Sequence, residues 1–304
     1  MFELWVPITI GAAFLQNARS AIQKHLKGRL STTGATFVRF GYGAPVAIAY
    51  ILILHYLIGL PWPEPNATFA MYVAIGGITQ ILATFLLVYL FGLRNFAVGT
   101  AYSKTEAIQA AAFGFIILAD PLSVGAGVAI LIGFAGVVLI SVAHTSLNAA
   151  SLIAATFSRT AVIGLLSGAL FGLSAVGYRA ASLSIGGGEG SFMMQAGYAL
   201  ACATVFQTII MLVYMQWREP GQIKAVAKAW RPASLVGLAG VLGSVCWFTA
   251  MTIQSVAYVR SLGQIELIFT FASSYFIFKE RPNKAETAGV ILIALGIIVL
   301  LQSK

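Results

Sequence analysis

Three charged side chains lie deep inside long apolar stretches and are the residues best placed to do chemistry. Glu106 and Glu266 each lie about 15 Å along an apolar segment, close to the middle of a bilayer. An acid at that depth is costly to insert, so it usually faces a cavity or a partner. We expect these acids to bind a cationic group or a coupling proton. The alternative is a structural ion pair or a protonated, hydrogen-bonded helix contact.

Lys104 is the third deep charge, and it lies two residues before Glu106. Residues two apart on a helix do not face each other. Lys104 therefore needs a partner elsewhere, and Glu266 is the candidate. Two uses of this lysine stay open. It could hold the carboxylate of a substrate, or it could simply fasten the two halves of the chain together.

Uncharged polar and aromatic side chains in the same stretches outline a candidate cavity. An amide facing lipid would leave hydrogen bonds unmet, so these groups should face inward, and aromatic rings can hold an aromatic group or a quaternary ammonium. The candidates are Gln16, Asn17, Gln80, Tyr102, Gln109, Gln195 and Trp247. The alternative is that they bond helix to helix, as polar side chains in membrane bundles often do.

Four arginines lie nearer the ends of apolar stretches. We expect Arg39, Arg179 and Arg260 to be interfacial anchors, because a long arginine stem lets the guanidinium reach the lipid headgroups. Arg39 has Tyr42 on the same helix face and so keeps the alternative of lining an entrance. Arg19 is similar to Arg39 in this respect.

The composition decides the class of protein that positions these groups. Of the 304 residues, 59% are hydrophobic and 9% are charged, against about 25% charged in ordinary soluble domains. This excludes a soluble enzyme, a nucleic-acid binder and a disordered protein. Segments long enough for apolar helices of about 20 residues run at 3–23, 33–59, 69–93, 96–118, 122–143, 160–184, 191–216, 233–253, 256–278 and 285–302. The sequence therefore predicts an all-α integral membrane protein with ten transmembrane helices.

Cysteine and histidine positions give no sign of a metal or haem site. Cys202 and Cys246 lie inside apolar segments, and the three histidines lie singly near segment ends. We therefore expect no cofactor. The sequence also lacks a phosphate-binding loop and a nucleophile beside a base, so we expect no enzyme activity.

Basic residues are concentrated on one side of the predicted bundle. The gaps after the odd-numbered segments hold Lys24, Lys27, Arg29, Arg94, Arg159, Arg218, Lys224, Lys228, Arg231, Lys279, Arg281 and Lys284, and the other side has only Lys304. The positive-inside rule places the basic gaps in the cytoplasm and both termini outside. Within the gap 217–232, the spacing of Lys224 and Lys228 predicts a basic surface helix.

The two halves of the chain align without a gap at an offset of 160 residues over the last three segments of each half. The matched pairs include Glu106 with Glu266, Asp120 with Glu280 and Gly136 with Gly296. We therefore predict two five-helix repeats, at 1–143 and 160–304, joined by a linker at 144–159. Because five is an odd number, the second repeat must be inverted in the membrane. Inverted repeats are typical of transporters with a site near the midplane.

The last segment of each half follows a similar motif. Lys279-Glu280-Arg281-Pro282 leads into Gly289 and Gly296, and a weaker copy, Asp120-Pro121, leads into Gly125, Gly127, Gly133 and Gly136. With the five-plus-five plan, these motifs make the whole chain resemble the ten-helix EamA type of the drug/metabolite transporter superfamily. The copy in the first half of the chain departs from the pattern, because it has Asp120 in place of a glutamate and Pro121 follows immediately. The resemblance implies both termini in the cytoplasm, opposite to the charge distribution, so orientation stays open.

The resemblance further implies export or exchange of amino acids and other small metabolites, driven by an ion gradient or by the gradient of the substrate itself. We accordingly expect a secondary active transporter of a small polar metabolite, an amino acid or related compound, that works by alternating access about a midplane site. The alternative is a membrane-embedded enzyme acting on a lipid-type substrate. We expect a multi-pass protein of the plasma (inner) membrane, a monomer or homodimer surrounded by lipids, with protons as candidate coupling ion and no nucleic-acid partner.

Overall fold

The computed structural model of the protein describes residues 3–26, 28–90, 103–142, 159–186, 191–276 and 283–303. These ranges consist of helices and the segments that connect them, and they contain no β-strand. The all-α prediction is therefore confirmed for the described part of the chain.

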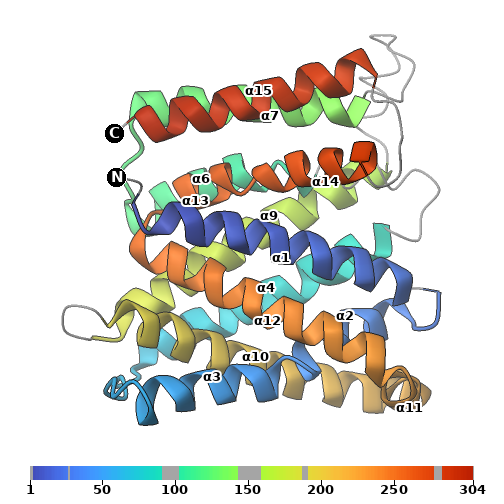
Figure 1. Ribbon diagram of the computed structural model, residues 1–304. Coiled ribbons are helices and arrows are strands. Elements are labelled where there is room, and N and C mark those ends of the chain that lie inside the picture. Colours follow the sequence, from blue (N-terminus) through green and yellow to red (C-terminus); the bar gives the residue numbers. More distant parts are fainter. Residues whose placement is uncertain are drawn as a thin grey trace.

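The helices lie roughly side by side along one common direction, and both termini lie at the same end of the bundle (Figure 1). We call this end the termini end, and we call the opposite end, where α1 finishes and α11 lies, the basic end. The helices are α1 (Trp5–Leu26), α2 (Thr32–Gly41), α3 (Ala44–Tyr56), α4 (Ala67–Leu90), α6 (Glu106–Leu118), α7 (Val124–Val142), α9 (Arg159–Ser184), α10 (Phe192–Arg218), α11 (Pro220–Lys228), α12 (Trp230–Ile253), α13 (Val256–Leu262), α14 (Ile265–Phe276) and α15 (Lys284–Gln302).

Six helical segments of the described chain are long and apolar enough to cross a membrane. They are α2 with α3, α4, α9, α10, α12 and α15. The outside of the bundle is also apolar: Ile116, Leu131 and Val213 are each more than 60% exposed. Such a surface suits lipid and would favour aggregation in water. The chain is therefore an integral, multi-pass membrane protein.

The segment 33–59, predicted to be one continuous helix, is interrupted. α2 ends at Gly41 and α3 begins at Ala44. Pro45, in the first turn of α3, explains the break, because proline has no amide N–H and its ring clashes with the preceding turn of a helix.

The segment 256–278 is interrupted as well, between the end of α13 and the start of α14. Gly263 lies in this break, and a Cβ atom there would come within 2.5 Å of the Trp247 ring, so the close approach requires glycine. A second turn, at residues 104–105, directly precedes α6. The turn before α14, at residues 263–264, thus lies within one residue of the position that an offset of 160 from the turn before α6 gives.

Packing joins the two halves of the chain closely. The most extensive helix pairs are α4 with α9, α7 with α15, and α1 with α12. In the pair α7 and α15, which lies along one side of Figure 1, a Cβ atom at Gly136 would be 2.6 Å from the Gly289 carbonyl oxygen, and one at Gly296 would be 2.8 Å from the Gly133 nitrogen. The glycines of the sequence motif therefore let these two helix backbones approach closely.

The gap 217–232 contains the predicted basic helix, which is α11, with Lys224 and Lys228 exposed and Val226 buried against the basic end of the bundle. Beneath it, one apolar cluster includes Leu26, Phe37 and Met215. A larger apolar cluster occupies the middle of the bundle and its termini end. The candidate site lies next to this larger cluster.

Candidate functional site

A cavity of about 250 Å³ lies among helices from both halves of the chain, and we call it the central cavity. It is close to the lower end of the ~300–1,000 Å³ usual for small-molecule sites. Its polar wall includes Gln16, Asn17, Arg19, Arg39, Gln80, Lys104, Glu106, Trp247, Arg260 and Glu266. The cavity also reaches Ala21 and Lys24, which are exposed near the basic end of α1.

The two deep acids of the sequence both line this cavity. Glu106 is the first residue of α6, and Glu266 is the second residue of α14. The first turn of a helix favours negative charge, because its backbone N–H groups are not all bonded within the helix. The turns before α6 and α14 therefore place two helix starts, each with an acid, at the middle of the protein, as in the interrupted helices of secondary transporters.

Each acid is paired with a cation from the other half of the chain. Lys104 Nζ lies 2.7 Å from Glu266 Oε2, the pairing that the sequence indicates. The guanidinium of Arg260 lies 3.0 Å from Glu106 Oε1. Both pairs are largely withdrawn from solvent, so each cation offsets the cost of an acid within the membrane.

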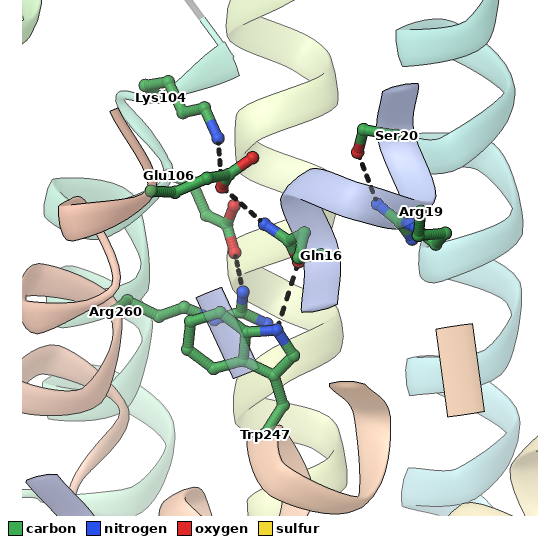
Figure 2. Close-up of polar contacts among 8 residues, drawn as sticks. Gln16, Arg19, Ser20, Lys104, Glu106, Trp247 and Arg260 are labelled. Atoms are coloured by element: carbon green, nitrogen blue, oxygen red, sulfur yellow. Dashed lines mark hydrogen bonds and ion pairs between the residues drawn. The ribbon is translucent and has the colours of Figure 1, made fainter. Parts of the chain in front are cut away.

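Gln16 and Trp247 connect the acids to the aromatic wall. The Gln16 side-chain amide donates to Glu266 Oε2 at 2.8 Å and accepts from the Trp247 indole N–H at 3.1 Å. The Arg260 guanidinium lies over the Trp247 ring, 4.4 Å from its centroid. Figure 2 shows Gln16 between Lys104 on one side and Trp247 on the other. These contacts fix the orientation of the ring and the two charge pairs together.

The prediction that Arg39 and Arg260 are interfacial anchors is wrong, and so is the similar prediction for Arg19. All three line the central cavity. Arg19 is 3% exposed and Arg39 is 7% exposed. Arg39 and Arg260 each belong to a short helix that precedes a break, so a position near the end of an apolar segment is not near the membrane surface. The alternative for Arg39 and Arg19, that they line an entrance, is closer to what the structure shows.

Gln80 lines the cavity as part of a buried amide and phenol cluster. The Tyr178 hydroxyl donates to Gln80 Oε1 at 3.0 Å, and Gln207 Nε2 donates to the same oxygen at 2.9 Å. Tyr178 also lines the cavity, whereas Gln207 lies behind it. Neither Tyr178 nor Gln207 is among the site residues predicted from the sequence. Their common signal is a polar atom in the middle of a long apolar helix.

Other predicted site residues are not brought to the cavity. Gln109 donates to Thr105 Oγ1 at 2.9 Å, and Gln195 donates to the Ile185 carbonyl at 2.8 Å. Hydrogen bonds of this structural kind were the alternative to lining the cavity that the sequence left open for these residues. Asn17 does line the cavity. Tyr102 lies outside the described residues.

Arg179 is also not an interfacial anchor. Its Nε lies 3.2 Å from Asp120 Oδ2, and its terminal nitrogens donate to the backbone carbonyls of Met251 and Gln254. These contacts lie where α6, α9 and α12 meet at the termini end of the bundle. We call them the Arg179 cluster. The cluster joins the first half of the chain to the second on the side away from Lys24.

The arrangement provides charge pairs, amides and aromatic rings around a small space, which suits a small polar molecule. In the described ranges, no group of three or more His, Cys, Asp or Glu side chains is placed to hold a metal ion. Cys202 and Cys246 are not disulfide-bonded.

Comparison with protein families agrees with this geometry. The sequence profile of the EamA-like transporter family matches residues 158–302. This part of the chain therefore belongs to the EamA-like transporters, within the drug/metabolite transporter superfamily. The match indicates a membrane transporter of the drug/metabolite type. Members of this class lie in lipid membranes, have small-molecule substrates and are transporters rather than enzymes.

Comparison with solved structures supports the fold. A crystal structure of another protein superimposes with a TM-score of 0.70 at 15% sequence identity, covering 99% of this chain and 97% of that one. At this identity the likeness shows the fold alone. No curated protein sequence matches significantly.

Proposed function

We propose that the protein is a secondary active transporter of a small polar metabolite, an amino acid or related compound, which works by alternating access about the central cavity. The observation that carries the proposal is the pair of acids, Glu106 and Glu266, at two helix starts around one cavity, each paired with a cation from the other half of the chain. Charged groups at this depth mark substrate and ion pathways.

Helix pairing supports the two inverted repeats that alternating access uses. α7 and α15 have 19 residues each and begin 160 residues apart, at Val124 and Lys284. In a repeat of this kind α1 corresponds to α9, and α4 corresponds to α12. The packing of α1 on α12 then corresponds to the packing of α9 on α4, and both pairs occur. We propose ten transmembrane helices in this arrangement, with the halves moving against each other.

The described conformation is asymmetric between its two ends. The central cavity reaches exposed residues toward the basic end, whereas the Arg179 cluster ties α6, α9 and α12 together at the termini end. We propose that this is the state open toward the basic end. Opening the other end then requires that Arg179 separate from Asp120.

Counterflow in proteoliposomes with a labelled amino-acid pool tests the proposal. We expect flux with the wild-type chain and its loss in Glu266→Gln, because the variant leaves Lys104 without its carboxylate. Glu64→Gln is the matched control, since Glu64 is exposed outside the helices. If flux continued unchanged in Glu266→Gln, the pair would have no part in transport.

A further inference from the structure

The charges around the central cavity are unequal. Its described lining contains five cationic side chains, Arg19, Lys24, Arg39, Lys104 and Arg260, against two carboxylates, Glu106 and Glu266. Both carboxylates are already paired, with Arg260 at 3.0 Å and with Lys104 at 2.7 Å. A cationic substrate would have to displace a charged side chain from an existing pair in order to find a counter-charge.

Apart from Lys24, which is exposed near the basic end, the cations of the wall that these two pairs do not use are Arg19 and Arg39. Within the described residues, neither guanidinium forms an ion pair with a carboxylate. Arg19 donates to Ser20 Oγ at 3.2 Å, and Arg39 donates to Thr84 Oγ1 at 3.2 Å. The Nε of Arg19 is buried and has no hydrogen-bond acceptor in the part of the chain that the structure describes. Figure 2 shows Arg19 apart from the cluster of Lys104, Glu106 and Arg260.

The two arginine stems lie next to each other although they come from different helices, α1 and α2. Both pack on Gly240 of α12: a Cβ atom at that glycine would lie 3.3 Å from Arg39 Cγ and 3.5 Å from Arg19 Cδ. Gly240 thus leaves room for two arginines side by side. A guanidinium presents several N–H donors in one plane and matches the oxygens of a carboxylate or phosphate.

Two neighbouring buried cations that have no carboxylate in direct contact among the described residues are costly in a membrane interior. An anion between them would neutralise charge and supply the missing acceptors. The wall of the same cavity also includes Phe171 and Phe248, which suit a carbon skeleton. The cavity therefore offers an anion-binding part and an apolar part within about 250 Å³.

We propose that the central cavity selects small organic anions and that Arg19 and Arg39 hold the carboxylate or phosphate group. This inference rests on the proposed function, because it narrows the substrate class of the same cavity. Of the compounds related to amino acids, it favours those with a net negative charge over neutral zwitterions and organic cations.

Calorimetric titration of the purified full-length protein in detergent tests the inference without requiring transport. The probes are succinate for the carboxylate source, glycerol 3-phosphate for the phosphate source, glycerol as a neutral control and choline as a cationic control. Each is titrated to about 10 mM, which is above the ordinary range of metabolite affinities. We expect saturable binding of at least one anion and of neither control, and the preferred anion distinguishes carboxylate from phosphate.

Variants then assign the binding to the two arginines. Arg19→Gln and Arg39→Gln should each weaken anion binding about tenfold or more, because each removes charge-assisted hydrogen bonds. Arg231→Gln should leave it unchanged, since Arg231 is exposed at the start of α12. Arg19→Lys and Arg39→Lys keep the positive charge, so they preserve folding if a glutamine variant does not. They should still weaken anion binding several-fold, because a lysine ammonium lacks the planar, forked donors of a guanidinium.

Three outcomes would overturn the inference: no saturable binding of either anion, equal binding of choline or glycerol, or full anion affinity in the glutamine variants. Counterflow of the same labelled probes separates this inference from the proposed function. Anion binding without flux would leave the anion site standing and contradict transport. Flux of choline without anion binding would leave transport standing and contradict the anion site.

Discussion

Lys104 and Glu266, 162 residues apart in the chain, form an ion pair with Nζ 2.7 Å from Oε2. Lys104 comes from the turn before α6 and Glu266 from the first turn of α14, so the pair joins the two interrupted segments of the bundle. Arg260 and Glu106 join the same two segments with the charges exchanged: the cation comes from the second half of the chain and the carboxylate from the first. The two pairs make the middle of the protein a contact between the halves of the chain as well as the wall of the central cavity.

Removing one partner of the Lys104–Glu266 pair should destabilise the protein. Breaking a fully buried pair costs about 3–5 kcal/mol, and because the Lys104 side chain is 21% exposed, we expect about 2–3 kcal/mol for Lys104→Gln. The double variant Lys104→Gln/Glu266→Gln should recover part of this loss, since it leaves no unpaired charge. Thermal unfolding in detergent measures both. Additive losses in the double variant would show that the two side chains do not interact.

The Arg179 cluster should control access from the termini end. Asp120→Asn removes the negative partner of Arg179 and should favour opening there by about 1–2 kcal/mol, a factor of about 5–30 in population. Alkylation of Met251→Cys by a membrane-impermeant maleimide, added from the termini side, reports this opening, because Met251 lines the cavity. The Glu64→Gln background serves as the control. An unchanged alkylation rate in Asp120→Asn would exclude a gating role for the cluster.

Gly136 should tolerate no side chain. A Cβ atom there would be 2.6 Å from the Gly289 carbonyl oxygen, so Gly136→Ala should cost about 1–3 kcal/mol through displacement of α15 from α7. At Gly127, on the same helix, a Cβ atom would have no atom of another described segment within 4 Å, and Gly127→Ala should be neutral or slightly stabilising because alanine favours helix. Unfolding temperatures of the two variants give the comparison. Equal temperatures would contradict the close packing of these helices.

Trp247 should contribute to substrate affinity because its hydrogen bond to Gln16 holds the indole ring in a fixed orientation. Trp247→Phe keeps a ring beside Arg260 but loses the hydrogen bond to Gln16 Oε1. We expect this variant to weaken substrate affinity several-fold, as a lost hydrogen bond of about 1 kcal/mol implies, with little change in unfolding temperature. Trp217→Phe is the matched control, because Trp217 is exposed at the basic end of α10. The same affinity in both variants would remove Trp247 from the site.

Much of the central cavity could be predicted from the sequence, because charges inside an apolar chain are few. Glu106, Glu266 and Lys104 stand out by depth alone, and spacing excludes a bond between Lys104 and Glu106. The helix break at Gly263 could not be predicted, because one glycine in an apolar helix is usually tolerated and this one depends on the Trp247 ring of the neighbouring helix α12. Distance along the chain does not determine the direction of a side chain.

Because the direction of a side chain does not follow from its position along the chain, the placement of two arginines in the cavity wall could not be predicted. Arg19 and Arg39 lie near enough to segment ends for their stems to reach the headgroups, and the sequence does not show that both turn inward. Their direction depends on Gly240, which belongs to the other half of the chain and leaves space for both stems. Gln109 and Gln195 were predicted from the sequence to line the cavity, but they do not. Acceptors close to them in the chain accept their amide hydrogen bonds instead.

The claim that substrate crosses the bilayer through the central cavity is tested most directly at Ser244, which is 7% exposed and lines that cavity. In a background with Cys202 and Cys246 replaced by serine, Ser244→Cys is alkylated in proteoliposomes and counterflow is measured before and after. We expect alkylation to abolish flux and a transported substrate to slow the alkylation. Full flux through completely alkylated protein would show that substrate does not pass through this cavity.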